Sequence, residues 1–500
     1  MRPGLAEEKF TRVTVGMLLI AMRQPEYRKI TEFKTVAEFR QFLVEQGYDI
    51  GLVDQVASDG TAALAQPARC CGREIGNRWA ILPMEGWDCQ NDGTPSEMTR
   101  RRWLRFAGSG AKLLYGTEAA AVMHSGRSSP KQLWVAEHTF SALKELCSEM
   151  RRVHAEKFGR ADDFCIGLQL THSGRYSYPN DAYRRESRTA YAHPLLDIKF
   201  ENTAANVVSD DEISDIVEHF IEAAVLARAA GFDFVDIKQA HGYLAHEFLT
   251  AHDRPGPYGG SFENRTRFFR EIADGIARAC PGYPISSRIS IFDLLPYQKR
   301  ADGIGEPMGW EGAYPYAFGG DGTGRGMDPD LREPVALVKL MQKYGVDLIC
   351  ATVGSPYYNP HVQRPAYYPV LDGYEMPEHP LYNVARHLAS VRRFKELCPD
   401  VMVVGSGYTC LQDYLPNAAE YAVAKGWTDF VGIGRMVLSY PEICTDSLSG
   451  RPLDRRRICR TLGDCTNAPR SGLISGCYPL DDFYKKLPQA AVLRDKKREA

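Results

Sequence analysis

Four polar stretches of the chain carry side chains that could bind a charged ligand or move a proton. They are Gln169–Tyr176, Lys238–Leu249, Tyr258–Arg265, and Gly405–Gly407 taken together with Val431–Arg435. The first three contain amides, histidines, tyrosines and a lysine, which donate or accept hydrogen bonds and can take part in acid–base chemistry. The last combines glycines with an arginine, which suits the binding of a phosphate.

The phosphate site is predicted from Gly405, Gly407, Gly434 and Arg435. These residues end the last two predicted strands, where backbone N–H groups and the N-terminus of the next helix can face an anion. Arg435 adds a fixed positive charge, although a surface salt bridge is the alternative role for this side chain.

Eight short apolar runs alternate with longer amphipathic stretches and supply the framework for these residues. This alternation is typical of parallel strands that are covered by helices, and eight units favour an α/β fold of the (β/α)8 TIM barrel type. A doubly wound open sheet is the alternative, because the pattern alone does not show closure. The predicted strands are Arg78–Pro83, Ala111–Thr117, Cys165–Leu170, Phe234–Lys238, Ile285–Ser290, Asp347–Thr352, Val401–Val404 and Phe430–Ile433, and the clearest helical stretches are Asp210–Ala230, Phe262–Cys280, Leu331–Tyr344 and Tyr382–Leu397.

The rest of the chain is assigned around this barrel. Residues 1–75 form a predicted N-terminal extension or cap, residues 76–455 the barrel, and residues 456–500 a basic C-terminal tail that we expect to be solvated. The apolar segment Val13–Met22 is flanked by charges and lacks a cleavage site, which favours a buried helix or strand over a signal peptide.

Composition excludes several classes of function. The 61 basic and 63 acidic residues nearly balance, which argues against a nucleic-acid-binding protein. No uninterrupted apolar run reaches the roughly 18 residues of a membrane span, so no membrane partner is expected. The 13 scattered cysteines indicate reduced thiols and a cytoplasmic location. The absence of a His-Glu-x-x-His motif and of a P-loop argues against metal-dependent hydrolysis and nucleotide hydrolysis, and no metal site is predicted.

The sequence His241-Gly-Tyr-Leu244 and the sequence Tyr258-Gly-Gly-Ser-Phe-Glu-Asn-Arg265 give the chain a resemblance to the old yellow enzyme family. The resemblance extends from about Asn77 to Pro441. It implies a TIM barrel with FMN at its mouth. It also implies that NADH or NADPH reduces the flavin, which then passes hydride to an electron-poor alkene.

The resemblance also implies roles for the cofactor-binding residues. Arg435 resembles the arginine that binds the FMN phosphate, and Arg288 resembles the one that faces flavin N1 and stabilises the reduced ring. Gln169 resembles the amide that contacts the pyrimidine edge of the flavin. Three further residues match positions that lie against the flavin, namely Pro83, Met84 and Ala119. Glu85 departs from the family, which often has a small residue near flavin N5, and its ionisation state is left open.

The catalytic candidates are Tyr243, His241 and Lys238. Tyr243 resembles the family's proton donor, and His241 the second of two donors that bind an activating carbonyl. The first donor is usually His or Asn, so Lys238 is a departure. An ammonium group there would favour a carboxylate-like substrate group, whereas a buried Lys paired with an acid is the alternative.

The tail bears on the presence of an iron–sulfur cluster. Larger relatives hold a [4Fe–4S] cluster on four cysteines, of which Cys465 and Cys477 keep the spacing here. The other two positions fall on Ile458 and Thr461, and Cys459 is one residue out of register. Because such a cluster is held by four thiolates, we predict none. Electrons are then expected from a diffusing NADH or NADPH or from a partner.

The predicted function is therefore that of an FMN-dependent oxidoreductase, which takes hydride from NADH or NADPH and reduces an activated C=C bond. The substrate is expected to be a small molecule with a carboxylate or carbonyl group. Two alternatives are open, a flavin-dependent amine or alcohol dehydrogenase or demethylase on the same barrel, and a barrel that binds a phosphorylated ligand without redox chemistry. The sequence also leaves a homo-oligomer open.

Overall fold

The computed structural model describes residues 27–323 and 328–499. The predicted apolar segment Val13–Met22 lies outside the described residues, and so does the first third of the predicted extension. Among the described residues, no helix has the length and apolar character needed to cross a bilayer.

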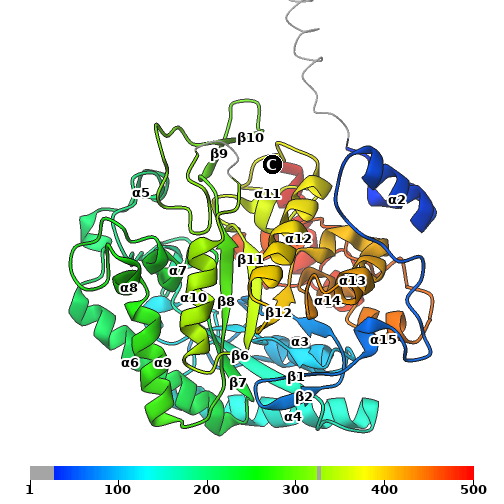
Figure 1. The fold of residues 1–500 in the computed structure, drawn as a ribbon, viewed down its shortest axis with the longest axis horizontal. Coiled ribbons are helices and arrows are strands. Elements are labelled where there is room, and N and C mark those ends of the chain that lie inside the picture. The colour runs from blue at the N-terminus through cyan, green and yellow to red at the C-terminus, as the bar shows by residue number, and fades with distance from the viewer. Residues whose placement is uncertain (1–26, 324–327, 500) are drawn as a thin grey trace, which may run out of the picture.

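A closed barrel of eight parallel strand positions forms the centre of the molecule (Figure 1). The last strand pairs in parallel with the first, Val431 opposite Trp79, and this pairing closes the sheet. The TIM barrel prediction is therefore confirmed, and the open-sheet alternative is wrong. The strands are β3 (Trp79–Ile81), β4 (Leu113–Leu114), β6 (Cys165–Thr171), β7 (Phe234–Ile237), β8 (Ile285–Phe292), β11 (Leu348–Val353), β12 (Met402–Gly405) and β13 (Phe430–Ile433).

The second barrel position is split into two short strands. Both β4 and β5 (Ala119–Ala121) pair with β6, whereas the sequence predicts one strand over Ala111–Thr117. Gly116 interrupts the position with a φ of 82°, and a Cβ on it would lie 2.9 Å from the Cβ of Gln169. The interruption turns the buried Glu118 toward α3 (Glu97–Ala107), where it accepts hydrogen bonds from Arg102 and Trp103.

Amphipathic helices cover the outside of the barrel (Figure 1). The longest, α6 (Asp210–Ala230), begins with a capping box on Ser209 and ends at Gly231 in the left-handed conformation. The predicted helix Phe262–Cys280 is instead divided at Thr266 into α8 (Phe262–Arg265) and α9 (Arg267–Ala279). The other barrel helices are α4 (Phe140–Phe158), α5 (Leu196–Phe200), α7 (Leu244–Leu249), α10 (Arg332–Gln342), α11 (Pro360–Gln363), α12 (Pro380–Leu397), α13 (Leu415–Ala424), α14 (Arg435–Ser439) and α15 (Ile443–Leu448).

Two additions extend the barrel. In the N-terminal segment, α2 (Val36–Glu45) packs beside the chain that follows β12, with the Phe39 and Tyr414 rings stacked 4.7 Å apart. The hairpin β1 (Ala68–Cys70) and β2 (Arg73–Ile75) follows α2. A second hairpin, β9 (Tyr297–Lys299) and β10 (Gly305–Pro307), lies in the long loop after β8.

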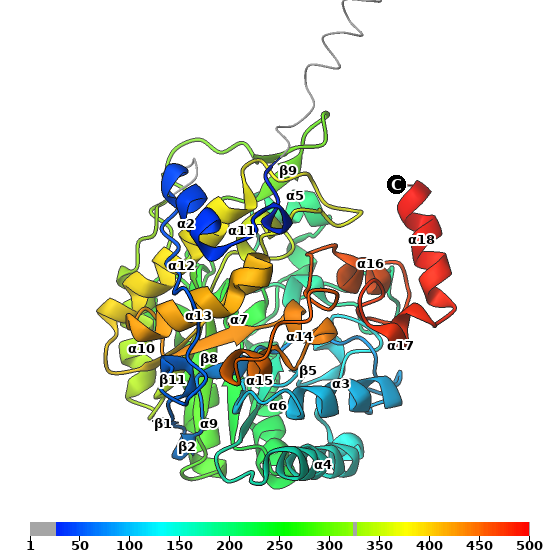
Figure 2. The same ribbon diagram turned by 90° about the vertical axis from the view of Figure 1, so that its right-hand side faces the viewer.

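The segment after the barrel folds against it, so the prediction of a solvated tail is wrong (Figure 2). It contains α16 (Asp464–Arg470), α17 (Asp482–Lys485) and α18 (Gln489–Glu499). Sparse apolar side chains of this segment are buried, among them Ile458, Ala468 and Leu493. Asp481 also accepts hydrogen bonds from Arg101 and Arg105 of α3. Residues 456–499 are called the C-terminal segment below.

Candidate active site

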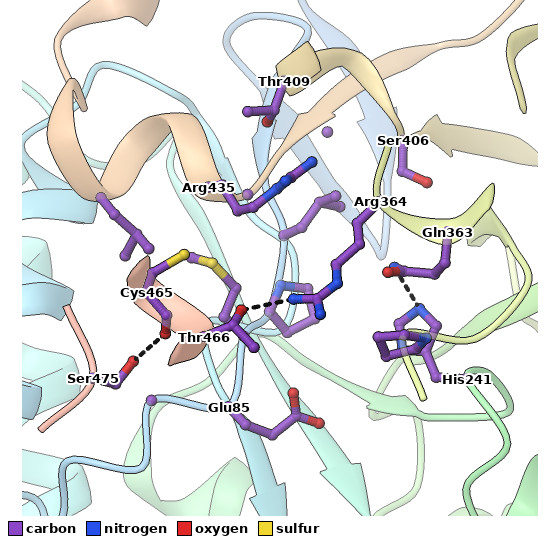
Figure 3. Close-up of a pocket in the computed structure, with 18 of the residues that line it drawn as sticks. Glu85, His241, Gln363, Arg364, Ser406, Thr409, Arg435, Cys465, Thr466 and Ser475 are labelled. Carbon is purple, nitrogen blue, oxygen red and sulfur yellow. Dashed lines mark hydrogen bonds between the residues drawn. The ribbon is translucent and has the colours of Figure 1, made fainter. Parts of the chain in front are cut away.

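A cavity of about 220 Å³ lies where the barrel strands end at their carboxyl termini. The loops after β3, β7, β12 and β13 contribute to it, and Figure 3 shows their side chains around one space. Eight of the predicted site residues line the cavity, namely Pro83, Met84, Glu85, His241, Arg288, Gly407, Gly434 and Arg435.

The other five predicted residues lie behind the lining. Ala119 pairs with Gln169 across β5 and β6, and both side chains are buried. Gly405 ends β12 and faces Thr428, whose Oγ1 would be 3.0 Å from an added Cβ. Lys238 and Tyr243 contact each other and lie next to lining residues. The predicted site residues thus lie at one end of the barrel, eight of them in the cavity lining and five behind it.

At one end of the cavity, Gly407, Gly434 and Arg435 leave room for an anion. Gly407 has a φ of 95°, and a Cβ there would meet the His387 ring at 3.0 Å, so this position requires glycine. A Cβ on Gly434 would meet only the Met84 Sδ, at 3.8 Å. Arg435 donates to the carbonyl of Pro365 at 3.0 Å and has no carboxylate within 4.0 Å among the described residues.

A second arginine, which sequence reasoning missed, faces the same end of the cavity. The Arg364 guanidinium donates to Thr466 Oγ1 at 2.7 Å, and among the residues that the structure describes its other terminal nitrogen is buried without a partner (Figure 3). Burial and the nearby Arg470 and Arg435 lower the pKa of Arg364 to about 9. An anion bound between Arg364 and Arg435 would relieve this repulsion.

A hydrogen-bonded group on β6, β7 and β8 lies behind the lining and reaches the cavity through Arg288. Asp236 accepts from the Gln169 side chain and from the backbone N–H of Arg288, each at 2.5 Å. Burial raises the pKa of Asp236 to about 6. The Gln169 Oε1 and the Arg288 Nε are buried with no partner among the described residues, and of these two residues Arg288 lines the cavity.

Glu85 and Lys238, both departures from the family pattern, form an ion pair. The Lys238 Nζ donates to Glu85 Oε1 at 2.5 Å, and the lysine side chain is only 2% exposed. Burial acts to raise the pKa of Glu85, but the charge and hydrogen bond of Lys238 outweigh it and hold this pKa below its usual value. Burial lowers the pKa of Lys238, opposed by Glu85. The pair is therefore ionised but net neutral.

Tyr243 and His241 occupy the turn that follows β7. The Lys238 Nζ lies 3.6 Å from the centre of the Tyr243 ring, and the Tyr243 hydroxyl is 2.8 Å from that of Tyr357. His241 has a φ of 67°, an uncommon conformation for a non-glycine residue that the Ser290 hydroxyl supports by accepting from its N–H. Burial and nearby cations hold the pKa of His241 well below its usual value, so the ring is neutral.

The loop that carries Glu85 is anchored by a buried network that the sequence did not reveal. Glu118 accepts from the Gly86 N–H at 2.7 Å and from the Arg102 guanidinium at 2.6 Å. Arg102 also binds Asp88 and lines the cavity. A Cβ on Gly86 would lie 1.9 Å from the Arg102 Nη2, so the network requires glycine at this position.

The C-terminal segment supplies part of the cavity wall through Cys465, Thr466 and Ser475. Cys459 and Cys477 are buried nearby, and burial raises the pKa of both thiols, with a further contribution from the neighbouring thiols. The absence of an iron–sulfur cluster stays a prediction.

Comparison with known proteins gives one family. The family described as "NADH:flavin oxidoreductase / NADH oxidase" matches residues 64–305. An NADPH dehydrogenase of a Geobacillus species is 32% identical over 251 residues, which are 47% of this chain and 68% of that protein. An NADPH dehydrogenase of Halalkalibacterium halodurans is 31% identical, with 55% of this chain and 65% of that protein aligned.

Solved structures share the fold at lower identity. A 2-naphthoyl-CoA reductase complex has a TM-score of 0.61 and 18% identity, covering 87% of this chain and 58% of its own. Histamine dehydrogenase from Rhizobium sp. 4-9 has a TM-score of 0.58 and 19% identity, covering 85% of this chain and 53% of its own. The chain thus spans little more than half the length of these structural neighbours.

Proposed function

Because the chain belongs to the NADH:flavin oxidoreductase / NADH oxidase family, we propose that it is an FMN-dependent oxidoreductase. In this proposal it takes hydride from NADH or NADPH and reduces an activated C=C bond of a small molecule. The observation that carries the proposal is the cavity between Arg288 and the pair Arg364 and Arg435, none of which has a carboxylate within 4.0 Å among the described residues.

The cavity fits FMN in the chemistry of its donors. Two guanidinium groups that have no carboxylate partner in the described part of the chain match the double negative charge of a terminal phosphate. The unpartnered Gln169 Oε1 and Arg288 Nε suit the polar edge of an isoalloxazine ring. Gly434 leaves space beside Arg435 where a side chain would otherwise stand. When bound, FMN supplies hydride acceptance from the nicotinamide and hydride donation to the alkene.

Protein side chains would bind and polarise the substrate. A neutral His241 whose Nε2 accepts from the Gln363 amide, at 3.2 Å, carries its proton on Nδ1 and can donate to a carbonyl oxygen. Since Glu85 compensates the charge of Lys238, this pair favours a carbonyl oxygen rather than a free carboxylate.

Tyr243 is the proposed proton donor to the substrate carbon next to the carbonyl. Burial raises the pKa of Tyr243 well above its usual value, so the phenol holds its proton at neutral pH. Its contact with Tyr357 orients the hydroxyl group.

The thirteen cysteines are all free, and this supports our proposal of a cytoplasmic location.

An anaerobic spectroscopic experiment tests the proposal. The purified protein should be yellow, release about one FMN per chain on denaturation, and be bleached by NADPH or NADH. Addition of 2-cyclohexenone or another activated alkene should restore the oxidised spectrum. Absence of flavin after reconstitution with FMN would reject the proposal in favour of a phosphate-ligand barrel, and bleaching by amines or alcohols but not by nicotinamides would favour a dehydrogenase.

A further inference from the structure

A second cavity, of about 420 Å³, opens beside the first and is called the outer cavity below. Pro356, in the loop after β11, lines both cavities. The next residue, Tyr357, lines the outer cavity, and its hydroxyl is 2.8 Å from that of Tyr243. The outer cavity is therefore separated from the proposed proton donor by a single side chain, that of Tyr357.

Aromatic residues make up seven of the nineteen residues that line the outer cavity. The Tyr176 and Tyr357 rings stack 3.8 Å apart with an interplanar angle of 10°. The Tyr176 hydroxyl is buried near Gly242 and has no partner among the described residues, so the stacked ring is the part of Tyr176 that is offered to a ligand. Trp87, Tyr178, Phe200 and Tyr374 add further rings. Surfaces of this kind bind flat rings through offset-stacked or edge-to-face contacts.

The charges of the outer cavity are predominantly positive. Arg185 lies over the Phe200 ring at 4.7 Å and donates to the Phe200 carbonyl at 2.8 Å and to the Tyr178 hydroxyl at 3.0 Å. The exposed Lys199 donates to the Tyr297 carbonyl at 2.8 Å. Neither cation has a carboxylate within 4.0 Å among the described residues, whereas Arg470 is paired with Asp372 at 2.6 Å. Arg185 and Lys199 thus lack an ion-pair partner in the described part of the chain, while burial of its ammonium lowers the pKa of Lys199 to about 8 and Asp372 is the acidic residue in the lining.

We propose that the outer cavity binds the non-reacting part of the substrate, and that this part is an aromatic ring that bears an anionic group. The rings would contact the aromatic part, while Arg185 and Lys199 bind the anion. A cationic group is disfavoured by the same two side chains. The inference rests on the proposed function for the reaction, but the binding it describes needs no flavin chemistry.

Three matched ligands test the chemistry by calorimetric titration of the oxidised protein reconstituted with FMN. They are 3-phenylpropionate, its neutral amide, and 3-cyclohexylpropionate, which keeps the charge but not the aromatic ring. We expect 3-phenylpropionate to bind at least about tenfold more tightly than either of the others, a difference of ~1.4 kcal/mol. Equal affinity for the acid and its amide would overturn the proposal.

Variants of the cationic lining residues test whether 3-phenylpropionate binds in the outer cavity. Arg185→Met should raise the Kd of 3-phenylpropionate about tenfold and leave that of the amide within about twofold. The adjacent Arg184 is exposed and does not line the outer cavity, so Arg184→Met is the matched control. Lys199→Met is a second, exposed variant expected to act in the same direction, in case Arg185→Met does not fold. If the charge variants behave like Arg184→Met, the proposal is wrong.

Two further measurements separate this inference from its alternatives. NADP⁺ is also an aromatic anion, so weakening of NADP⁺ alone by Arg185→Met would assign the outer cavity to the reductant and overturn the substrate proposal. If wild-type protein binds no FMN, the proposed function fails. The same titrations on the flavin-free protein would still support or reject the aromatic-anion site.

Discussion

Lys238 and Glu85 depend on each other for charge compensation at the edge of the candidate active site. Replacing Glu85 by Gln would leave a buried ammonium, 2% exposed, without its carboxylate. Loss of one partner of a buried pair costs about 3–5 kcal/mol, and because the Glu85 side chain is 23% exposed we expect ~1–3 kcal/mol here. Urea denaturation of Glu85→Gln measures this loss of unfolding free energy.

The double variant Glu85→Gln with Lys238→Met is the control for this prediction. It removes both charges, so at least half of the lost stability should return. If Glu85→Gln changed the unfolding free energy by less than ~0.5 kcal/mol, the pair would be structurally neutral.

Tyr243 should affect only one half of the proposed reaction. Tyr243→Phe removes the hydroxyl but keeps the ring beside Lys238. Flavin reduction by NADPH needs no phenol and should be nearly unchanged, whereas reoxidation by an alkene should slow by about 10²-fold or more. Stopped-flow absorbance follows both steps, with Tyr382→Phe as control, at an exposed tyrosine outside both cavities. Equal slowing of both steps would indicate a structural tyrosine.

Arg364 and Arg435 should share the binding of the FMN phosphate. Removing one charged hydrogen bond to a phosphate costs about 1.5–3 kcal/mol, so Arg364→Met and Arg435→Ala should each raise the Kd of FMN by tenfold or more. Quenching of flavin fluorescence on binding measures this Kd. Arg332→Met, at a side chain 89% exposed, should have no effect. Unchanged FMN binding by Arg364→Met would limit the phosphate site to Arg435.

At the scale of the elements, the sequence predicts most of the barrel. The bounds of β13 and α6 agree with their predicted ranges, because a continuous apolar run and a capped amphipathic stretch are local signals. The break between β4 and β5 was missed because it depends on Gln169 and Arg102, which pack against it from other elements. The C-terminal segment was missed because its few buried residues lie among many charges.

The docking of the C-terminal segment should depend on Asp481, which binds Arg101 and Arg105 of α3. Asp481→Asn should therefore loosen the segment and, through Thr466, weaken the position of Arg364. We expect faster proteolytic cleavage after residue 455 and a several-fold higher Kd for FMN. Asp482→Asn is the matched control, since that side chain is 83% exposed. Identical cleavage rates for the two variants would contradict the prediction.

For the molecule as a whole, buried histidines set the response to acid. Burial lowers the pKa of His154 to about 4 and those of His172, His361 and His387 to about 3. The unfolded chain binds protons at these sites as the pH falls below about 6.5 while the folded chain does not, so stability is lost on acidification. Asp236, with its pKa raised to about 6, acts in the opposite direction, and so do Glu118 and Glu247, whose pKa values burial raises, but the buried histidines outnumber these carboxyl groups.

We therefore expect the unfolding free energy to fall by roughly 2–4 kcal/mol between about pH 7 and pH 5.5. Urea denaturation at a series of pH values, with FMN saturating throughout, gives this dependence. His361→Gln should reduce the slope of unfolding free energy against pH by the equivalent of about one proton bound on unfolding. A stability that is constant or increases on acidification would show that these histidines are protonated in the folded protein.

The candidate site was predictable where one loop carries the signal, and not where distant loops meet. Gly434 and Arg435 are adjacent in sequence, and a glycine followed by an arginine after a strand indicates an anion site. The pairing of Lys238 with Glu85 joins residues 153 positions apart, and that of Arg364 with Thr466 spans 102. The residues that flank each of these four side chains in the sequence do not indicate either contact.

The wall that the C-terminal segment adds to the cavity has a consequence for biosynthesis. The ribosome makes β13, which closes the barrel at residues 430–433, before it makes Cys465, Thr466 and Ser475. A nascent chain thus passes through an interval in which the barrel can be complete while its cavity stands open on one side. Cofactor uptake is least obstructed during that interval, and docking of the later residues would then slow its escape.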